Sequence, residues 1–399
     1  MSYQGRFENQ KQPPRRGKKM GTGLKVTLIV LVVLLALVAG LVIFAVSYYY
    51  RMMNKMNIVT LPKNTHSYTD VYDETQPQSK PTVPVQTAPV TEATTAPTET
   101  TRAPMSADDI VNILLVGQAA REGEESHLAD TTILVSVNTY TGEVTLFSVL
   151  RDTLIGSIQY TDTSGKTHYS GGVKFNTCYH NGFLWGGKDN GTVDAMAFTN
   201  AVLMNDYGIE VDYNVEVSFD SFIKLIDYMG GVRIELTQAE ADYLNKDDVW
   251  VQRDIEPGVQ RLYGMEALCY ARMRKAEGDS DSDIKRTARQ RKLIEALLNK
   301  VRDMSLSELQ GWVDILLPMI TTTMQPNDVA GLLMKVIPVL PNLKVSSHTI
   351  PIENETLEGS RWGDTVDIYG DGFQHSVIRF DKNKNVKFIR AITEAEGIQ

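Results

Sequence analysis

The feature that most constrains this chain is an uncharged apolar segment near its N-terminus. Residues 26–50 carry no charged side chain and consist mostly of Leu, Val, Ile and Ala. A helix needs about 20 apolar residues to span the hydrocarbon layer of a membrane, and this segment is long enough. It is too long for the apolar region of a signal peptide, and no small-residue cleavage site closes it. We therefore expect a single uncleaved transmembrane helix, with a cleaved signal peptide as the alternative.

The residues on either side of this segment predict its orientation. Residues 1–25 contain seven Lys or Arg and one Glu. The segment ends in Tyr48, Tyr49 and Tyr50, and aromatic residues are enriched at membrane interfaces. Because basic flanks stay in the cytoplasm, we expect residues 1–25 to form a cytoplasmic tail. The C-terminal domain would then lie outside the cell, anchored to the cell membrane by a single pass.

The charge of the remaining chain argues against one class of partner. The formal net charge is -9 overall, and residues 1–25 contribute +6, which leaves -15 for the rest. Binding to nucleic acid depends on a broad basic surface that neutralises phosphates. We therefore expect no nucleic-acid partner.

Composition divides the part after the apolar segment into a stalk and a folded domain. Thr, Pro and Ala dominate residues 81–104, which have little to bury. We predict an extracellular stalk over residues 51–106 and a folded extracellular domain over residues 107–399. Within that domain, residues 110–300 carry the motifs described below and residues 301–399 form a C-terminal part.

Short apolar runs and amphipathic stretches alternate within the folded domain. We predict strands at 111–117, 131–138, 143–150, 209–219 and 232–236, helices at 191–208, 219–232 and 300–340, and strand and loop over 341–399. Gly208 and Gly230-Gly231 end two of the helices, and Thr237 with Glu240 forms a capping box that begins another. This alternation is typical of a layered α-β-α domain with a central mixed β-sheet.

The two cysteines, Cys178 and Cys269, leave two possibilities open. A pair of cysteines outside the cell can form a disulfide, but two cysteines do not make a disulfide framework. Two separate buried thiols are the other possibility.

Residues 267–292 form the most basic stretch of this part of the chain. Tyr270, Arg272 and Arg274 alternate with smaller residues, which predicts an extended segment with both guanidinium groups on one face. From Asp283 onward the spacing is helical. Arg286 and Gln290, four residues apart, share one face of that helix. Arginine near a helix start opposes the helix dipole, so we weigh a solvated helix terminus against a site that binds an anion such as phosphate.

Three other polar positions have both a structural and a functional interpretation. Arg151 and Asp152 follow a strand and could form a salt bridge. Lys174 lies in a Gly-rich loop at 172–182 and could be solvated. Asp130 immediately precedes a strand and could be a turn residue or a ligand of Mg²⁺.

The order of these motifs resembles the LytR–CpsA–Psr family of cell-envelope proteins. The shared elements are L-A-D-T, L-R-D, K-F-N, the L-Y-G-x-x-A-L-x-Y-x-R-x-R segment and the closing D-I-x-R-x-x-R-Q, within residues 110–300. The resemblance implies a membrane-anchored enzyme of the α/β class that binds a polyprenyl-pyrophosphate-linked glycan. It further implies Mg²⁺-assisted transfer of the glycopolymer to peptidoglycan through a phosphodiester bond.

The resemblance also implies roles for individual residues. Arg151, Asp152, Arg272 and Arg286 would be catalytic, Arg151, Lys174, Arg272, Arg274, Arg286 and Gln290 would bind the pyrophosphate, and Asp130 would bind the metal. The chain departs from the family pattern at Ala119, where the family has Asp, and at Leu128, where it has Arg. These departures leave two other functions open: a non-catalytic binder of the polyprenyl-linked glycan, and a pyrophosphatase acting on the same lipid.

The apolar chain of such a carrier would need a long pocket. Phe198, Val202, Phe219, Phe222, Leu225 and Ile226 could line one. Apolar residues at helical spacing are also what an ordinary protein core requires.

Overall fold

A computed structural model describes residues 51, 54–61, 109–118, 127–246, 249, 251–274, 276, 282–352, 361–368 and 372–395. The chain divides into two compact units, Met1–Asn54 and Lys55–Gln399, and the second is the subject below. The predicted tail at 1–25, the transmembrane segment and most of the stalk lie outside the described residues. Within the described ranges, no helix has the length and apolar character needed to cross a membrane.

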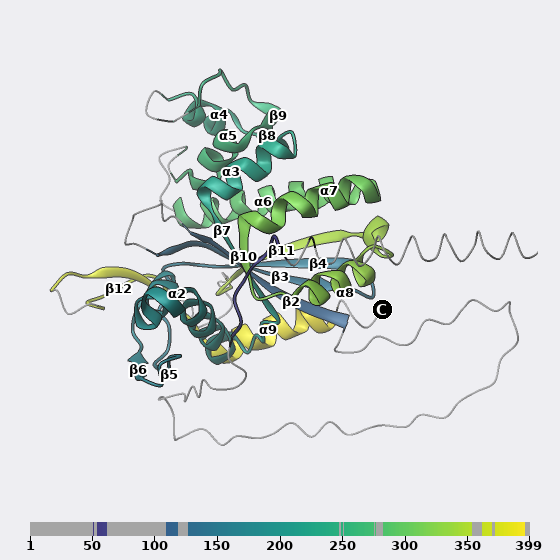
Figure 1. The fold of residues 1–399 in the computed structure, drawn as a ribbon. Helices are drawn as coiled ribbons and strands as arrows, with labels where there is room; N and C mark the ends of the chain where they lie inside the picture. Colours follow the sequence, from purple (N-terminus) through teal and green to yellow (C-terminus); the bar gives the residue numbers. More distant parts are fainter. Residues whose placement is uncertain are drawn as a thin grey trace, which may run out of the picture. The chain divides into compact units, whose positions relative to one another are not determined.

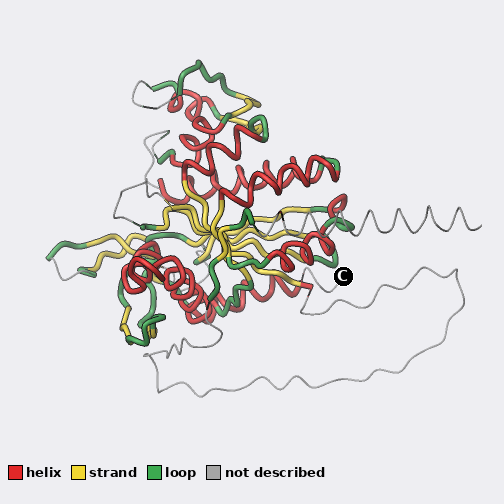
Figure 2. Tube along the Cα trace, viewed as in Figure 1, coloured by secondary structure: helices red, strands yellow, loops and turns green. Residues whose placement is uncertain are grey.

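A seven-stranded mixed sheet forms the centre of the domain (Figures 1 and 2). Its order is β1 (Asn57–Ile58), β10 (Ile320–Thr322), β7 (Tyr213–Ser218), β2 (Ile110–Gln118), β3 (Ala129–Asn138), β4 (Glu143–Val149) and β11 (Lys344–Ile350). The pairs β1–β10, β2–β7 and β4–β11 are parallel, and the pairs β7–β10, β2–β3 and β3–β4 are antiparallel. The predicted central mixed sheet is thus confirmed.

Both faces of the sheet are buried, which explains why β3 and β4 are apolar almost throughout. Leu134 and Phe147 pack in one core cluster, whereas their neighbours Ile133 and Leu146 pack in another, as the two-residue period of a strand requires. Helices α2 (Asn176–Tyr207) and α9 (Lys382–Ala395) cover the first face, and α6 (Ser282–Arg302) covers the second (Figure 1). The layered α-β-α architecture is therefore confirmed.

The long helix α2 corrects one prediction. The loop expected at 172–182 becomes helical from Asn176, because Cys178 and Tyr179 are fully buried in the first core cluster. The helix ends at Gly208, as predicted, in the left-handed conformation with φ 65°. The C-terminal part also differs, because α9 forms where strand and loop were expected. Its Ile389 packs into the same cluster.

A second group of elements lies beyond α6. It consists of α3 (Phe219–Tyr228), β8 (Val232–Leu236), α4 (Gln238–Leu244), β9 (Gly258–Leu262) and α5 (Gly264–Arg272). These elements and α6 share one core cluster. The capping box of Thr237 and Glu240 begins α4, as predicted. The extended segment predicted at Tyr270–Arg274 is wrong, because α5 continues to Arg272.

The remaining elements complete the domain: β5 (Ile158–Thr161), β6 (Thr167–Ser170), α7 (Leu306–Leu316), η2 (Leu317–Met319), α8 (Pro326–Val336), η3 (Leu340–Asn342), β12 (Arg361–Val366) and β13 (His375–Arg379). Cys178 and Cys269 are both free thiols, so the disulfide is excluded. The apolar residues considered for a lipid pocket are split, since Phe198 and Val202 belong to the first core cluster and Phe222 and Ile226 to the cluster around α5.

Candidate active site

The candidate residues gather at one edge of the central sheet. Strands β2, β4, β7 and β11 run parallel to one another and end at this edge, and β3 begins there, as the pairing of Gln118 with both Ala129 and Ser218 shows. Ligands of open α/β sheets commonly bind at the carboxyl ends of strands. Asp130 is the second residue of β3 and so lies within the strand, which corrects its predicted place before it. Arg151 and Asp152 follow β4 directly.

Arg151 is the centre of a network of ion pairs at this edge. Its Nη1 lies 3.6 Å from Oδ1 of Asp130, and its Nε lies 3.6 Å from Oδ2 of Asp152 and 3.2 Å from Oδ1 of Asp283. Lys174, just before α2, donates a hydrogen bond of 2.8 Å to Asp152. The fold therefore brings together Arg151, Asp152, Lys174 and Asp130, which are far apart in sequence.

Arg286 enters this network from the first turns of α6. Its side chain is only 3% exposed, and its Nη2 lies 2.7 Å from Oδ1 of Asp283. The pKa of Arg286 is lowered to about 10, mainly by burial; the positive charges of Arg151 and Arg274 contribute to this lowering, and Asp283 and Asp130 oppose it. Nη2 of Arg286 faces Asp283 without hydrogen-bond geometry, and Nε has no partner in the described part of the chain. Nε is therefore the N–H group of Arg286 that an anion can still satisfy.

Arg272 and Gln290 lie at the border of this network. The guanidinium of Arg272, at the end of α5, lies over the ring of Phe219 at 4.9 Å from its centroid. Gln290 donates a hydrogen bond of 3.4 Å to the carbonyl of Ala271. Arg272 thus connects α5 to α3, and Gln290 connects α6 to α5. These contacts hold in place the segment that leads to Arg274.

Two interactions near the site were not predicted. Asp283 forms ion pairs with both Arg151 and Arg286. Arg289 is buried and donates hydrogen bonds to Glu240 at 2.8 Å and to the carbonyl of Met273 at 3.0 Å. The three-residue spacing of Asp283 and Arg286 is a signal from which their contact could have been predicted, but no sequence signal points to the contact with Arg151.

A half-buried acid lies on the neighbouring strand β7. Glu216 of β7 accepts a hydrogen bond from the hydroxyl of Tyr179 in α2. Burial raises the pKa of Glu216, and the hydrogen bond from Tyr179 partly opposes that rise. This pair connects α2 to the sheet.

The arrangement can bind an anion with several oxygen atoms. Arginine N–H groups match phosphate oxygens in geometry, and charge-assisted hydrogen bonds are stronger than neutral ones. Within the described residues, no three His, Cys, Asp or Glu side chains form a group that could hold a metal ion. Ala119, where the chain departs from the family pattern, lies outside the described residues.

Comparison with known proteins gives consistent matches. A model of the LytR_cpsA_psr family matches residues 62–369. "Polyisoprenyl-teichoic acid--peptidoglycan teichoic acid transferase TagU" of Bacillus licheniformis is 32% identical over 197 residues, which are 49% of this chain and 54% of that protein. "Biofilm regulatory protein A" of Streptococcus mutans is 28% identical over 235 residues, 59% of this chain and 49% of that protein. The chain thus spans about half the length of the curated relatives it matches.

Solved structures share the fold at low sequence identity. Protein gbs0355 of Streptococcus agalactiae has a TM-score of 0.53 and 19% identity, covering 73% of this chain and 88% of that one. TagV of Bacillus subtilis has a TM-score of 0.50 and 21% identity, covering 73% of this chain and 98% of that one. The family match extends over well more than half of the sequence, and the chain therefore belongs to the LytR_cpsA_psr family.

Proposed function

We propose that this chain is a membrane-anchored phosphotransferase of cell wall assembly. It would move a glycopolymer from a polyprenyl-pyrophosphate carrier to peptidoglycan through a phosphodiester bond. The observation that carries the proposal is the buried Arg286, which shares Asp283 with Arg151 at the carboxyl edge of the sheet and whose Nε has no partner among the described residues. The transferase name of the TagU relative supports the same class of reaction.

In this proposal the cationic side chains bind the pyrophosphate. Arg151, Lys174 and Arg286 neutralise its oxygens from three different elements. We assign three further residues to the same pyrophosphate: Arg272 at the end of α5, Arg274 just after α5, and Gln290 on α6. Transfer of a phosphoryl group depends mainly on positioning and on neutralising the oxygens that do not take part in bond exchange. Arg151, Arg272 and Arg286 would therefore also be catalytic.

Asp152 is the residue we propose to accept the proton of the acceptor. A sugar hydroxyl of peptidoglycan attacks the phosphorus atom that carries the glycan, and the new O–P bond forms. The bond from this phosphorus to the bridging oxygen breaks, and polyprenyl phosphate leaves. Lys174 and Arg151 hold the Asp152 carboxylate in place.

Asp130 is the residue that would hold a Mg²⁺ ion. Its side chain is 28% exposed, so its carboxylate remains accessible from the site. Protein sites for Mg²⁺ commonly supply one or two carboxylates, and substrate phosphates complete the shell. When bound, the ion would neutralise negative charge on those phosphates.

The apolar segment 26–50 is the anchor in this proposal. It would keep the domain at the outer face of the cell membrane, where both the carrier lipid and peptidoglycan are present. Because the basic residues precede the segment, the N-terminus would be cytoplasmic.

Transfer by the purified full chain tests this function. The chain in detergent would be given a polyprenyl-pyrophosphate-linked glycan, peptidoglycan fragments and Mg²⁺, and the products would be identified by mass spectrometry. We expect the double variant Arg272→Ala with Arg286→Ala to lose transfer by at least roughly 10²–10³-fold. Arg390→Ala, on the exposed side of α9, is the control and should retain the wild-type rate.

Three outcomes would change the assignment. Full activity of the double variant would exclude these arginines from the site. Binding of the lipid without any transfer would indicate a non-catalytic binder. Release of the glycan phosphate to water, with none on peptidoglycan, would indicate a pyrophosphatase.

A further inference from the structure

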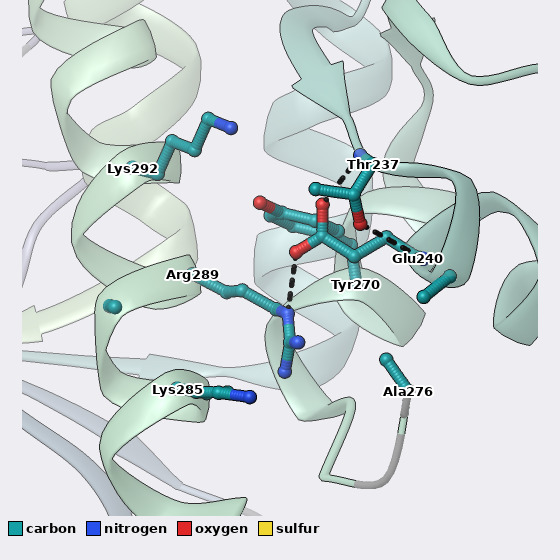
Figure 3. Close-up of a pocket in the computed structure, with 9 residues that line it drawn as sticks. Thr237, Glu240, Tyr270, Ala276, Lys285, Arg289 and Lys292 are labelled. Carbon is teal, nitrogen blue, oxygen red and sulfur yellow. Dashed lines mark hydrogen bonds and ion pairs between the residues drawn. The ribbon is translucent and has the colours of Figure 1, made fainter. Parts of the chain in front are cut away.

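A groove lined by basic residues follows the face of α6 that is turned away from the candidate active site. One part is a cavity of about 300 Å³ between α6 and the beginning of α4, and Lys285, Arg289 and Lys292 line it. Figure 3 shows these three side chains extending from one helix, with Glu240 and Thr237 opposite. A second part, of about 460 Å³, lies between α6 and the two-stranded sheet of β8 and β9. Both parts are lined by Lys292, which makes them neighbours along the helix.

Helix geometry separates this groove from the active site. Each residue of an α-helix turns by about 100°. Lys285 and Lys292 therefore lie within about 20° of one direction, whereas Arg286 and Gln290 point roughly 100–140° away from Lys285. From Lys285 to Lys300 the helix rises about 22 Å, at about 1.5 Å per residue. The groove is thus a long surface on a different side of α6.

The groove carries more positive than negative charge. Its cations are Arg233, Arg261, Lys285, Arg289, Lys292 and Lys300, and its acids are Glu240, Glu295 and Asp303. Glu240 is already committed, because it accepts from Arg289 and from the backbone N–H of Thr237 at the start of α4. A basic excess at this place contrasts with the net charge of -9 of the chain.

The two-stranded sheet of β8 and β9, which forms one wall of the groove, places two of these cations side by side. Arg233 of β8 and Arg261 of β9 are direct partners in the strand register, and both are exposed. Like charges that face each other across strands destabilise a sheet. Burial lowers the pKa of Lys300, and the charge of Arg261 lowers it further. An anion in the groove would relieve this repulsion.

We propose that this groove binds the anionic backbone of the glycopolymer, apart from the pyrophosphate at the active site; the proposal rests on the proposed function. A phosphodiester polymer fits because its charges recur along its length, as the cations recur along α6. The hydroxyl of Thr237 and the amide of Asn299 line the same groove and can hydrogen-bond to sugar or polyol hydroxyls. A groove of this length suits several repeats better than a single small anion.

Binding of a defined phosphodiester oligomer tests this proposal. The probe is a fluorescent oligo(glycerol phosphate) of six repeats, titrated by anisotropy into the full chain in detergent. Geranyl pyrophosphate is present in excess to fill the active site. The groove variant is Arg233→Gln with Lys285→Gln and Lys292→Gln, and we expect its affinity to fall by about tenfold or more. The wild-type affinity should also fall more steeply with salt than that of the variant, because fewer phosphates are neutralised in the variant.

The control variant removes three positive charges elsewhere. Lys188→Gln in α2, with Lys387→Gln and Arg390→Gln in α9, has the same net charge as the groove variant, and all three wild-type side chains are exposed. We expect less than about a twofold change in affinity for this control, since none of the three lines the groove. An equal loss in both variants would overturn the proposal, because it would show a general effect of charge. So would oligomer binding that disappears when geranyl pyrophosphate is added.

Two further arms separate the proposals and the possible partners. Vesicles containing phosphatidylglycerol and a single-stranded DNA 12-mer are titrated in parallel. Stronger groove-dependent binding to either would overturn the choice of a glycopolymer. If the chain fails to bind geranyl pyrophosphate yet binds the oligomer through the groove, the proposed function fails and the groove assignment stands.

Discussion

Replacing Arg286 by Met is expected to stabilise the protein in the absence of ligand. Arg286 is 3% exposed; its Nη2 lies 2.7 Å from Asp283 without hydrogen-bond geometry, and its Nε has no partner within the described residues. Asp283 also pairs with Arg151, so it keeps a cationic partner when Arg286 is replaced. Methionine fills a similar volume and adapts to irregular space, but it carries no charge that needs solvation. The substitution therefore removes an unfavourable buried charge and keeps most of the packing.

The pKa of Arg286 gives the magnitude. It falls from its ordinary value to about 10, mainly because of burial. Each unit of pKa corresponds to about 1.4 kcal/mol, so the charged guanidinium destabilises the folded state by roughly 3 kcal/mol. Because methionine loses part of the arginine contacts, we expect a gain on the order of 1–3 kcal/mol. A cation whose folded pKa is lowered destabilises the fold at every pH below that pKa, so the gain should be constant from about pH 5 to 8.

Urea unfolding of the full chain, followed by tryptophan fluorescence, measures this gain with and without inorganic pyrophosphate. A ligand that binds only the folded state at 100 times its Kd adds about 2.7 kcal/mol. We expect pyrophosphate to stabilise the wild type in this way and to have little effect on Arg286→Met. Without pyrophosphate the variant would be more stable than the wild type. With pyrophosphate only the wild type gains stability, so the difference between the two shrinks or reverses.

Arg289→Met is the matched control on the same helix. Arg289 is buried as well, but its Nε donates to Glu240 and its Nη1 donates to the carbonyl of Met273. Removing one partner of a buried ion pair destabilises a protein by about 3–5 kcal/mol, so this variant should move in the opposite direction. The reasoning fails if Arg286→Met is destabilised by as much as Arg289→Met, or if it keeps the full stabilisation by pyrophosphate.

Two other predictions concern the support of the site. Glu216→Gln keeps an oxygen that accepts the hydrogen bond from Tyr179 and removes the negative charge of a half-buried side chain. Because desolvation raises the pKa of Glu216 in the folded state, its carboxylate destabilises the fold at a pH above that pKa. The variant should be more stable than wild type near pH 8 in urea unfolding, and the difference should vanish as pH falls toward 4.5; a gain that does not depend on pH would contradict this cause. Gly264→Ala would place its Cβ 2.3 Å from the carbonyl oxygen of Ile223, so we expect a loss of about 1–3 kcal/mol in unfolding free energy. Gly331→Ala in α8, where no atom of the described chain lies within 4 Å of the new Cβ, is its control and should be neutral or stabilising.

Local patterns predicted much of the fold because they depend on neighbouring residues. The turn between β3 and β4, the end of α2 at Gly208 and the capping box of α4 all lie where the sequence placed them. The misplaced α5 has a local cause. The five residues from Tyr270 to Arg274 alternate in size and fit a strand, but the first three of them end a helix that begins earlier, at Gly264. A short window could not distinguish the two periods.

The beginning of α2 shows where tertiary contacts override local preference. Gly, Asn and His near residue 180 favour a loop, yet Cys178 and Tyr179 have no exposed surface in the core. Burial of an aromatic ring stabilises by an amount larger than the helix propensity of a few polar residues. The ion pair of Arg151 with Asp283 is a similar case, because Arg151 follows β4 and Asp283 begins α6, and only the packing of α6 on the sheet brings them together.

The closing R-x-x-R-Q motif combines residues with different tasks on one helix. Arg286 is buried without complete hydrogen bonding, which is unfavourable for folding and is explained by a bound anion. Arg289 is fully paired with Glu240 and Met273, and Gln290 donates to Ala271. The last two therefore fix the end of α5 and the residues that follow it, which include Arg274. The two carbonyl acceptors, of Ala271 and Met273, lie next to Arg272 and Arg274 in sequence. Arg289 and Gln290 therefore position Arg272 and Arg274, which we propose to bind the anion together with Arg286.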